Sequence, residues 1–100
     1  MNTTIKKLQI WYHDQCDGKW EHSWGIKINT LDNPGWSIKI DLNETKYEDS
    51  VWEDLFIDNG DDDWISCGKE SKMFRGIGDP TKLEDILNYF LTKVSDEGSV

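Results

Sequence analysis

Two histidines and two cysteines are the residues of this sequence whose chemistry would best suit a metal site or a nucleophile: His13, Cys16, His22 and Cys67. His13 and Cys16 stand three positions apart, so a helix would place them on one face. Structural zinc sites usually combine two such pairs, and Cys67 and His22 have no paired spacing. Nothing in the sequence marks either cysteine as lying in the electropositive pocket that activates a thiol, and no GxSxG, phosphate-loop or dinucleotide motif occurs. We therefore expect no metal, no cofactor and no enzymatic activity.

The acidic run DNGDDDW, residues 58–64, is a second candidate because carboxylates bind calcium. An EF-hand alignment from Asn59 to Glu70 places Trp64 at the sixth position, where the loop needs glycine. The flanking segments also have strand-like rather than helical composition. We interpret the run as a solvated turn or as an acidic contact patch for a partner.

The charge balance limits which partners are reasonable. Twenty acidic residues against eleven basic ones give a net charge of −9 at pH 7. A field of this sign repels nucleic acid and anionic lipid, and it favours a cationic partner or simply keeps the protein soluble. The N-terminus has no apolar signal region, and no segment is apolar enough to cross a membrane. We expect a single cytoplasmic domain over residues 1–100, with both thiols free.

Helical periodicity occurs near both ends of the chain. Residues 3–16 place apolar side chains at helical spacing, namely Ile5, Leu8, Trp11, Tyr12 and Cys16. Asp79 as N-cap and Pro80 as first helical residue predict a second helix. Its apolar stripe is Leu83, Ile86, Leu87, Phe90 and Val94, and the closing SDEGSV reads as a polar tail.

Between these helices the apolar period changes to two. Trp24, Ile26 and Ile28 alternate with polar residues, and the same alternation resumes from Trp36 to Leu42 after the turn DNPG. In that turn proline fixes φ, and Gly35 is expected to supply a positive φ. Further strands are expected near residues 51–58, 63–69 and 72–77. The predicted fold is α+β: a two-layer domain with a four- to five-stranded antiparallel sheet, in the order α-β-β-β-β-α.

The six tryptophans are too many for the interior of so small a domain. Trp11, Trp24 and Trp36 lie on the apolar stripes and are expected in the core. Large aromatic residues rimmed by polar groups supply binding energy at protein interfaces. The predicted partner-binding patch therefore comprises Asp58, Asp61, Asp62, Asp63, Trp52 and Trp64. A sugar-binding face built from tryptophans and carboxylates is the alternative.

Several strings of this sequence together resemble the Immunity protein 53 family, whose members are associated with bacterial polymorphic-toxin systems. They are Trp11-Tyr12, CDGKWEH at residues 16–22 and GIKINTLDNPGWSIKIDL at residues 25–42. The similarity continues through Asp63-Trp64, the Phe74-x-Gly76 segment and the closing helix, and it is least distinct over residues 43–60.

The resemblance implies a non-enzymatic, cytoplasmic antitoxin that binds a cognate toxin protein, for which a nuclease is one candidate. An acidic inhibitor could dock on the cationic surface that a nuclease needs. Trp20, Glu21 and His22 could be structural or contact residues. We expect the tryptophan-rich strings to specify the scaffold more than the contact surface.

Overall fold

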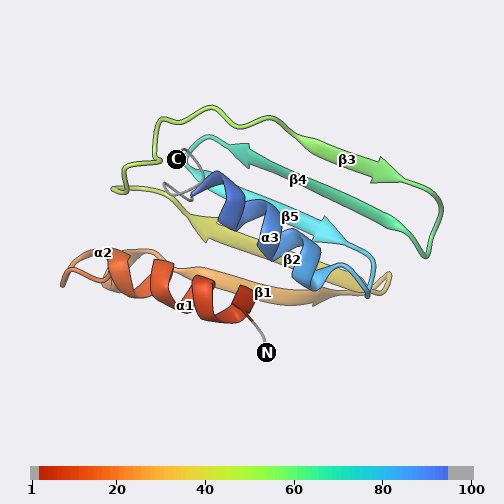
Figure 1. The fold of residues 1–100 in the computed structure, drawn as a ribbon, viewed down its shortest axis with the longest axis horizontal. Helices are drawn as coiled ribbons and strands as arrows, with labels where there is room; N and C mark the ends of the chain where they lie inside the picture. The colour runs from red at the N-terminus through yellow and green to blue at the C-terminus, as the bar shows by residue number, and fades with distance from the viewer. Residues whose placement is uncertain (1–2, 95–100) are drawn as a thin grey trace.

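The computed structural model describes residues 3–94, and its strands form one five-stranded antiparallel sheet flanked by helices (Figure 1). The elements are α1 (Thr3–Gln15), α2 (Trp20–Ser23), β1 (Ile26–Leu31), β2 (Gly35–Asp41), β3 (Leu55–Asp58), β4 (Trp64–Glu70), β5 (Met73–Gly78) and α3 (Leu83–Lys93). The α+β class, the five strands and the two terminal helices confirm the predicted fold. The short helix α2 was not predicted, and the predicted polar tail at residues 95–100 lies outside the described residues.

The strands are arranged in the order β1-β2-β5-β4-β3, with every neighbouring pair antiparallel. The hairpins β1–β2 and β4–β5 are therefore joined by a contact between β2 and β5, which lie more than thirty residues apart in the chain. Figure 1 shows α1 and α3 on the same face of the sheet, where α3 packs on β5 and β4 and also contacts α1. This covered face holds the core.

Aromatic and branched side chains fill the space between the covered face and the helices. Phe74 and Phe90 are fully buried with ring centroids 5.2 Å apart, and Trp11 meets Phe90 edge-on at 4.9 Å. A Cβ at position 76 would lie 2.3 Å from Cγ2 of Ile86, so glycine is what allows α3 to approach β5. Burying a side chain as large as Phe90 contributes roughly 1.5–3 kcal/mol.

The buried stripe of α1 is narrower than its apolar pattern predicts. Thr4, Leu8 and Trp11 are its buried residues, whereas Ile5 and Tyr12 are exposed. Thr4 lies within α1, one residue after its start. Its hydroxyl forms hydrogen bonds with the side chains of Asn88 (2.9 Å) and Glu84 (3.1 Å), and these bonds join the two long helices.

The strand predicted over residues 51–58 begins only at Leu55. Residues 51–54 have no regular pairing, so strand parity does not determine which way their side chains point. The apolar side chains of β1 are also more exposed to solvent than predicted, because Ile28 is 42% exposed on this edge strand. Trp24 and Ile26 are half-buried against the core, as is Trp36.

Two predictions about special backbone positions were wrong. The helix near the C-terminus begins at Leu83 after Lys82, so Asp79 is not its N-cap. Gly35 is not among the positive-φ glycines of the described chain, which are Gly18 and Gly60. Glycine is needed at position 35 because a Cβ there would lie 2.4 Å from the carbonyl oxygen of Gly78.

The segment DGKWE folds into a hydrogen-bonded loop that leads into α2. The Asp17 carboxylate accepts from the amides of Lys19 (2.9 Å) and Trp20 (3.0 Å). The Glu21 carboxylate accepts in return from the amides of Asp17 (3.0 Å) and Gly18 (2.8 Å). Trp20 is buried against Trp11, so Trp20 and Glu21 have structural roles, whereas the neighbouring histidine is exposed.

Candidate partner-binding face

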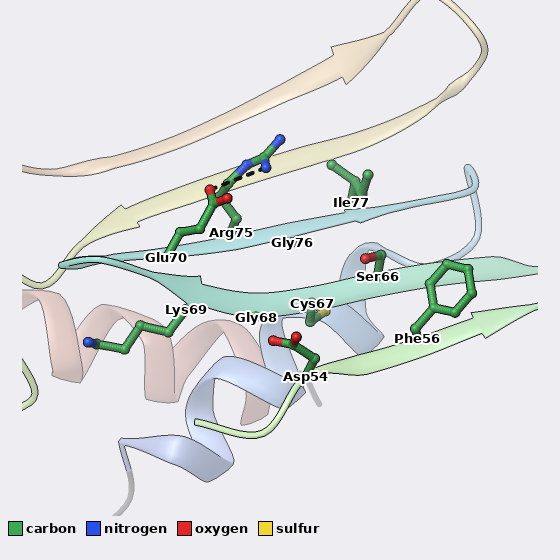
Figure 2. Close-up of a pocket in the computed structure, with 10 residues that line it drawn as sticks. All are labelled: Asp54, Phe56, Ser66, Cys67, Gly68, Lys69, Glu70, Arg75, Gly76 and Ile77. Carbon is green, nitrogen blue, oxygen red and sulfur yellow. Dashed lines mark hydrogen bonds and ion pairs between the residues drawn. The ribbon is translucent and has the colours of Figure 1, made fainter. Parts of the chain in front are cut away.

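The second face of the sheet points away from α1 and α3, and we call it the open face. Because side chains alternate along a strand, the register assigns each position to one face. Phe56 pairs with Ser66, and Ser66 pairs with Ile77, which places all three on the open face. Figure 2 shows these side chains rising on the side opposite the helices, whereas Cys67 points toward them. Phe56 is 70% exposed there.

A groove of about 580 Å³ lies where the open face meets the turns at one end of the sheet. We call it the acidic groove; its lining residues are Asn33, Pro34, Phe56, Asp58, Gly60, Asp61, Asp62, Trp64 and Pro80. Two of its walls are turns, the β1–β2 turn at residues 32–34 and the β3–β4 turn at residues 59–63. It has three carboxylates, two aromatic rings and no basic side chain in its lining. Such a groove suits a cationic group with apolar surroundings.

The β3–β4 turn presents its acidic side chains because it is fixed internally. The amide of Asn59 donates to the carbonyl of Asp63 (2.9 Å), and Gly60 adopts a φ of +117°. The Asp58 carboxylate accepts from the amide of Gly60 (3.1 Å). Asp61 and Asp62 at the tip remain exposed.

Asp79 holds the inner end of the groove in place, although the sequence indicated only a helix cap. Its carboxylate is fully buried and accepts from the amides of Trp64 (2.8 Å) and Thr81 (2.7 Å) and from the Thr81 hydroxyl (2.6 Å). The amide of Asp79 also donates to the carbonyl of Trp64 (3.0 Å). The hydroxyl of Thr81, then the two amides and Lys82, hold the pKa of Asp79 far below its usual range. The signal for this role was its Asp-Pro turn, but its partner Trp64 is too distant in sequence to infer.

Lys82 bridges two carboxylates beside this anchor. Its Nζ lies 2.8 Å from Oδ1 of Asp63 and 3.0 Å from Oδ2 of Asp79. The pKa of Asp63 is lowered by hydrogen bonds from Lys82 and from Asn59, and Asp63 in turn raises the pKa of Lys82. Asp63 is thus engaged within the molecule, and it does not line the groove.

The predicted contact residues therefore separate into two groups. Asp58, Asp61, Asp62 and Trp64 come together around the acidic groove. Trp52 lies elsewhere: its ring sits 6.2 Å from that of Phe74 and 6.0 Å from that of Phe90, on the covered side. Phe56 joins the groove instead, and its alternation with Leu55 and Ile57 in the strand predicted over residues 51–58 was the signal available in the sequence.

A second hollow, of about 410 Å³, lies further along the open face and contains both signs of charge (Figure 2). Its lining includes Arg75 and Glu70, whose side chains approach to 3.4 Å, together with Asp54 and Phe56. The missing side chain of Gly68 deepens it, since a Cβ there would lie 2.4 Å from a carboxylate oxygen of Asp54. Phe56 lines both hollows, so the two form adjacent parts of one surface.

The thiols and imidazoles do not form a reactive centre in the described part of the chain. Cys67 is buried in the core, and burial raises the pKa of its thiol to about 12, which keeps it protonated. Cys16 is half-buried and donates its S–H to the carbonyl of Tyr12 (3.3 Å). His13 and His22 are exposed. Among residues 3–94, no group of three or more histidine, cysteine or acidic side chains is arranged to hold a metal ion.

The architecture defines a small α+β protein with helices on one face of its sheet and a charged second face that the described helices leave uncovered. The family model of Immunity protein 53 matches residues 5–95, which is nearly the whole chain. The chain therefore belongs to the Immunity protein 53 family. No curated protein and no solved structure matches it. Within the described residues, no helix has the length and apolar character needed to span a bilayer.

Proposed function

We propose that this immunity protein neutralises a cognate toxin domain by binding a basic region of its surface in the acidic groove. Family membership supports the immunity role. The observation that supports this docking site is the joint presence of Asp58, Asp61 and Asp62 with Phe56 and Trp64 around one groove. The protein acts by occlusion rather than catalysis, as one domain, and in the cytoplasm where an incoming toxin would meet its target.

The two kinds of side chain in the groove contribute differently to binding. Phe56 and Trp64 offer apolar area that a partner can desolvate, and aromatic residues of this kind dominate interface energies. The carboxylates act at longer range, where the net charge of −9 raises the association rate with a cationic partner. A nuclease is a fitting target, because it holds its phosphate substrate with the lysines and arginines that this groove would cover.

The direct test starts from the neighbouring reading frame, which we expect to encode the cognate toxin domain, and uses that domain as the binding partner. We expect a stable complex whose association rate falls steeply as salt rises, because screening shortens the range of the attraction. The double variant Asp61→Lys/Asp62→Lys should weaken binding at least tenfold. Asp14→Lys, at an exposed position on α1, is the control and should change affinity by less than about twofold.

Two results would contradict this function. Failure of the wild-type chain to bind or inhibit that toxin domain would remove the proposed partner class. Unchanged affinity in the Asp61→Lys/Asp62→Lys variant, with an association rate that does not respond to salt, would move the docking site away from the acidic groove.

A carbohydrate-binding role is the second candidate, because Phe56 and Trp64 line one groove together with carboxylates. Aromatic rings can stack on sugar rings while carboxylates bond the hydroxyls. A glycan array followed by tryptophan fluorescence titration distinguishes the two functions. Saturable quenching by one glycan, lost in Trp64→Ala, would favour sugar binding over toxin binding.

A further inference from the structure

Three basic residues lie directly opposite one another on three neighbouring strands of the open face. In the register of the sheet, Lys27 of β1 pairs with Lys39 of β2, and Lys39 pairs with Arg75 of β5. All three are exposed, and we call them the cation row. Figure 2 shows Arg75 on the side of the sheet away from the helices. The row runs across the sheet, beside the hollow at Gly68.

This arrangement is unfavourable for the isolated protein. Like charges directly opposite each other on adjacent strands destabilise a sheet. Arg75 has one ion pair, with Glu70 at 3.4 Å. Lys27 and Lys39 form no ion pair or hydrogen bond within the described residues. Asp41 lies on the same face next to Lys39, and its carboxylate accepts from the amide of Gly25 (3.0 Å).

The position of the row contrasts with the composition of the whole chain. The protein has eleven basic residues against twenty acidic ones. Three of the eleven nevertheless lie side by side across adjacent strands of the open face. On the same face, the acidic groove begins at the level of Trp64, whereas Arg75 pairs with Gly68 four residues further along β4. At about 3.3 Å per residue, the two levels are roughly 13 Å apart along the strands. The open face therefore has two regions of opposite charge, the acidic groove and the cation row.

We infer that the cation row binds acidic side chains of the toxin domain, while the acidic groove binds its basic region. The inference rests on the proposed function and adds that the toxin surface must itself carry a basic region and an acidic region side by side. Carboxylates are the anions we assign here, because a guanidinium and two ammonium groups bind them through charge-assisted hydrogen bonds. A nucleic acid fits less well, since its phosphates would meet Asp58, Asp61 and Asp62 on the same face. Two regions of opposite charge would fix one orientation of the complex and reject toxins with other charge patterns.

The test measures toxin-domain affinity for charge-reversal variants of the row. Lys39→Glu should weaken binding at least tenfold, and Lys27→Glu/Lys39→Glu should weaken it further. Lys7→Glu is the matched control: it makes the same charge change at an exposed position on α1 and should alter affinity by less than about twofold. Because Lys39→Glu puts a carboxylate between two cations, its melting temperature should equal or exceed that of the wild type.

The outcomes separate this inference from the function on which it rests. If the wild-type chain binds the toxin domain and Lys39→Glu binds as well as Lys7→Glu, the cation row is not a contact and only the inference fails. If the wild-type chain does not bind, the proposed function fails and the inference fails with it. Competition between the toxin domain and a short single-stranded DNA, dependent on Lys39, would assign the row to nucleic acid and overturn the carboxylate assignment.

Discussion

The two faces of the sheet are built from the same five strands but differ in what their side chains contact. On the covered face, Ile38, Ile40 and Phe74 have no solvent exposure, and Gly76 lets α3 approach the backbone closely. On the open face, Phe56 is largely exposed beside charged groups of both signs. The covered face thus specifies the fold, whereas the open face has the exposed apolar and charged groups that recognition uses.

The sequence strings that carry the resemblance to the family contribute mainly to structure. In DGKWE, Asp17 and Glu21 form the loop before α2, and Trp20 enters the core. In LDNPGW, Gly35 lies against the carbonyl of Gly78, and the indole of Trp36 donates to the carbonyl of Pro80 (2.9 Å). Asn33 and Pro34 are the part of this string that reaches the acidic groove. These two strings therefore belong mostly to the scaffold.

Truncating one phenylalanine on each face gives the largest expected contrast. Phe90→Ala should lower the free energy of unfolding by about 3–5 kcal/mol, because it empties the centre of the aromatic cluster. Phe56→Ala should change stability by less than about 1 kcal/mol and instead weaken toxin binding at least tenfold. Urea denaturation and titration with the toxin domain measure the two effects. A large stability loss in Phe56→Ala would mean that the open face belongs to the core.

A pair of glycines offers a second contrast, of intermediate size. Gly76→Ala places a Cβ against Ile86 and the ring of Phe74, so we expect a loss of about 1–3 kcal/mol. Gly68→Ala meets only the carboxylate end of Asp54, which can rotate away, so its loss should stay below about 1 kcal/mol. Thermal denaturation of both variants measures the difference. Equal losses would indicate that α3 does not pack on β5 as described.

The buried carboxylate beneath Trp64 predicts how stability depends on pH. The pKa of Asp79 in the folded protein lies below its unfolded value of about 3.8, so its stabilising contribution is present above that pH and is lost as the pH falls through the folded pKa. Asp79→Asn should therefore melt at a lower temperature than the wild type near pH 7. The difference in melting temperature between the two proteins should narrow below about pH 4. A difference that stays constant down to pH 2 would contradict the ionised state of Asp79.

The smallest expected effect concerns the contact between the two long helices on the covered side. Thr4→Val removes the hydroxyl bonded to Asn88 and Glu84 and should cost about 0.5–1.5 kcal/mol. Thr3→Val, at the exposed neighbouring position, should change stability by less than about 0.5 kcal/mol. Chemical denaturation compares the stability of the two variants. If their denaturation midpoints are indistinguishable, the hydrogen bonds between the helices add nothing measurable to stability.

Local patterns in the sequence were sufficient to predict the two long helices, the central hairpin and the α+β class, but not the short helix α2. They failed where position depends on contacts distant in sequence. Trp52 was assigned to the partner-binding patch within a strand expected over residues 51–58, but that strand begins only at Leu55. Asp79 was assigned to the helix after it although Trp64 is its partner. The polar positions of Lys27 and Lys39 were visible in the β1–β2 alternation. Their alignment with Arg75 required the pairing of β2 with β5, which no local pattern encodes.

The most direct test of the open face as the toxin-binding surface is protection of single cysteines from alkylation. In a Cys16→Ser background, Cys67 stays unreactive because it is buried and its thiol pKa is about 12. Cysteines would be introduced as Phe56→Cys and Lys39→Cys on the open face and as Lys7→Cys on α1. Because substitutions at 56 and 39 also weaken binding, each variant is measured with the toxin domain at a concentration that saturates it; alkylation should then slow at positions 56 and 39 and stay unchanged at position 7. Protection at position 7, with full reactivity at 56 and 39, would contradict the account.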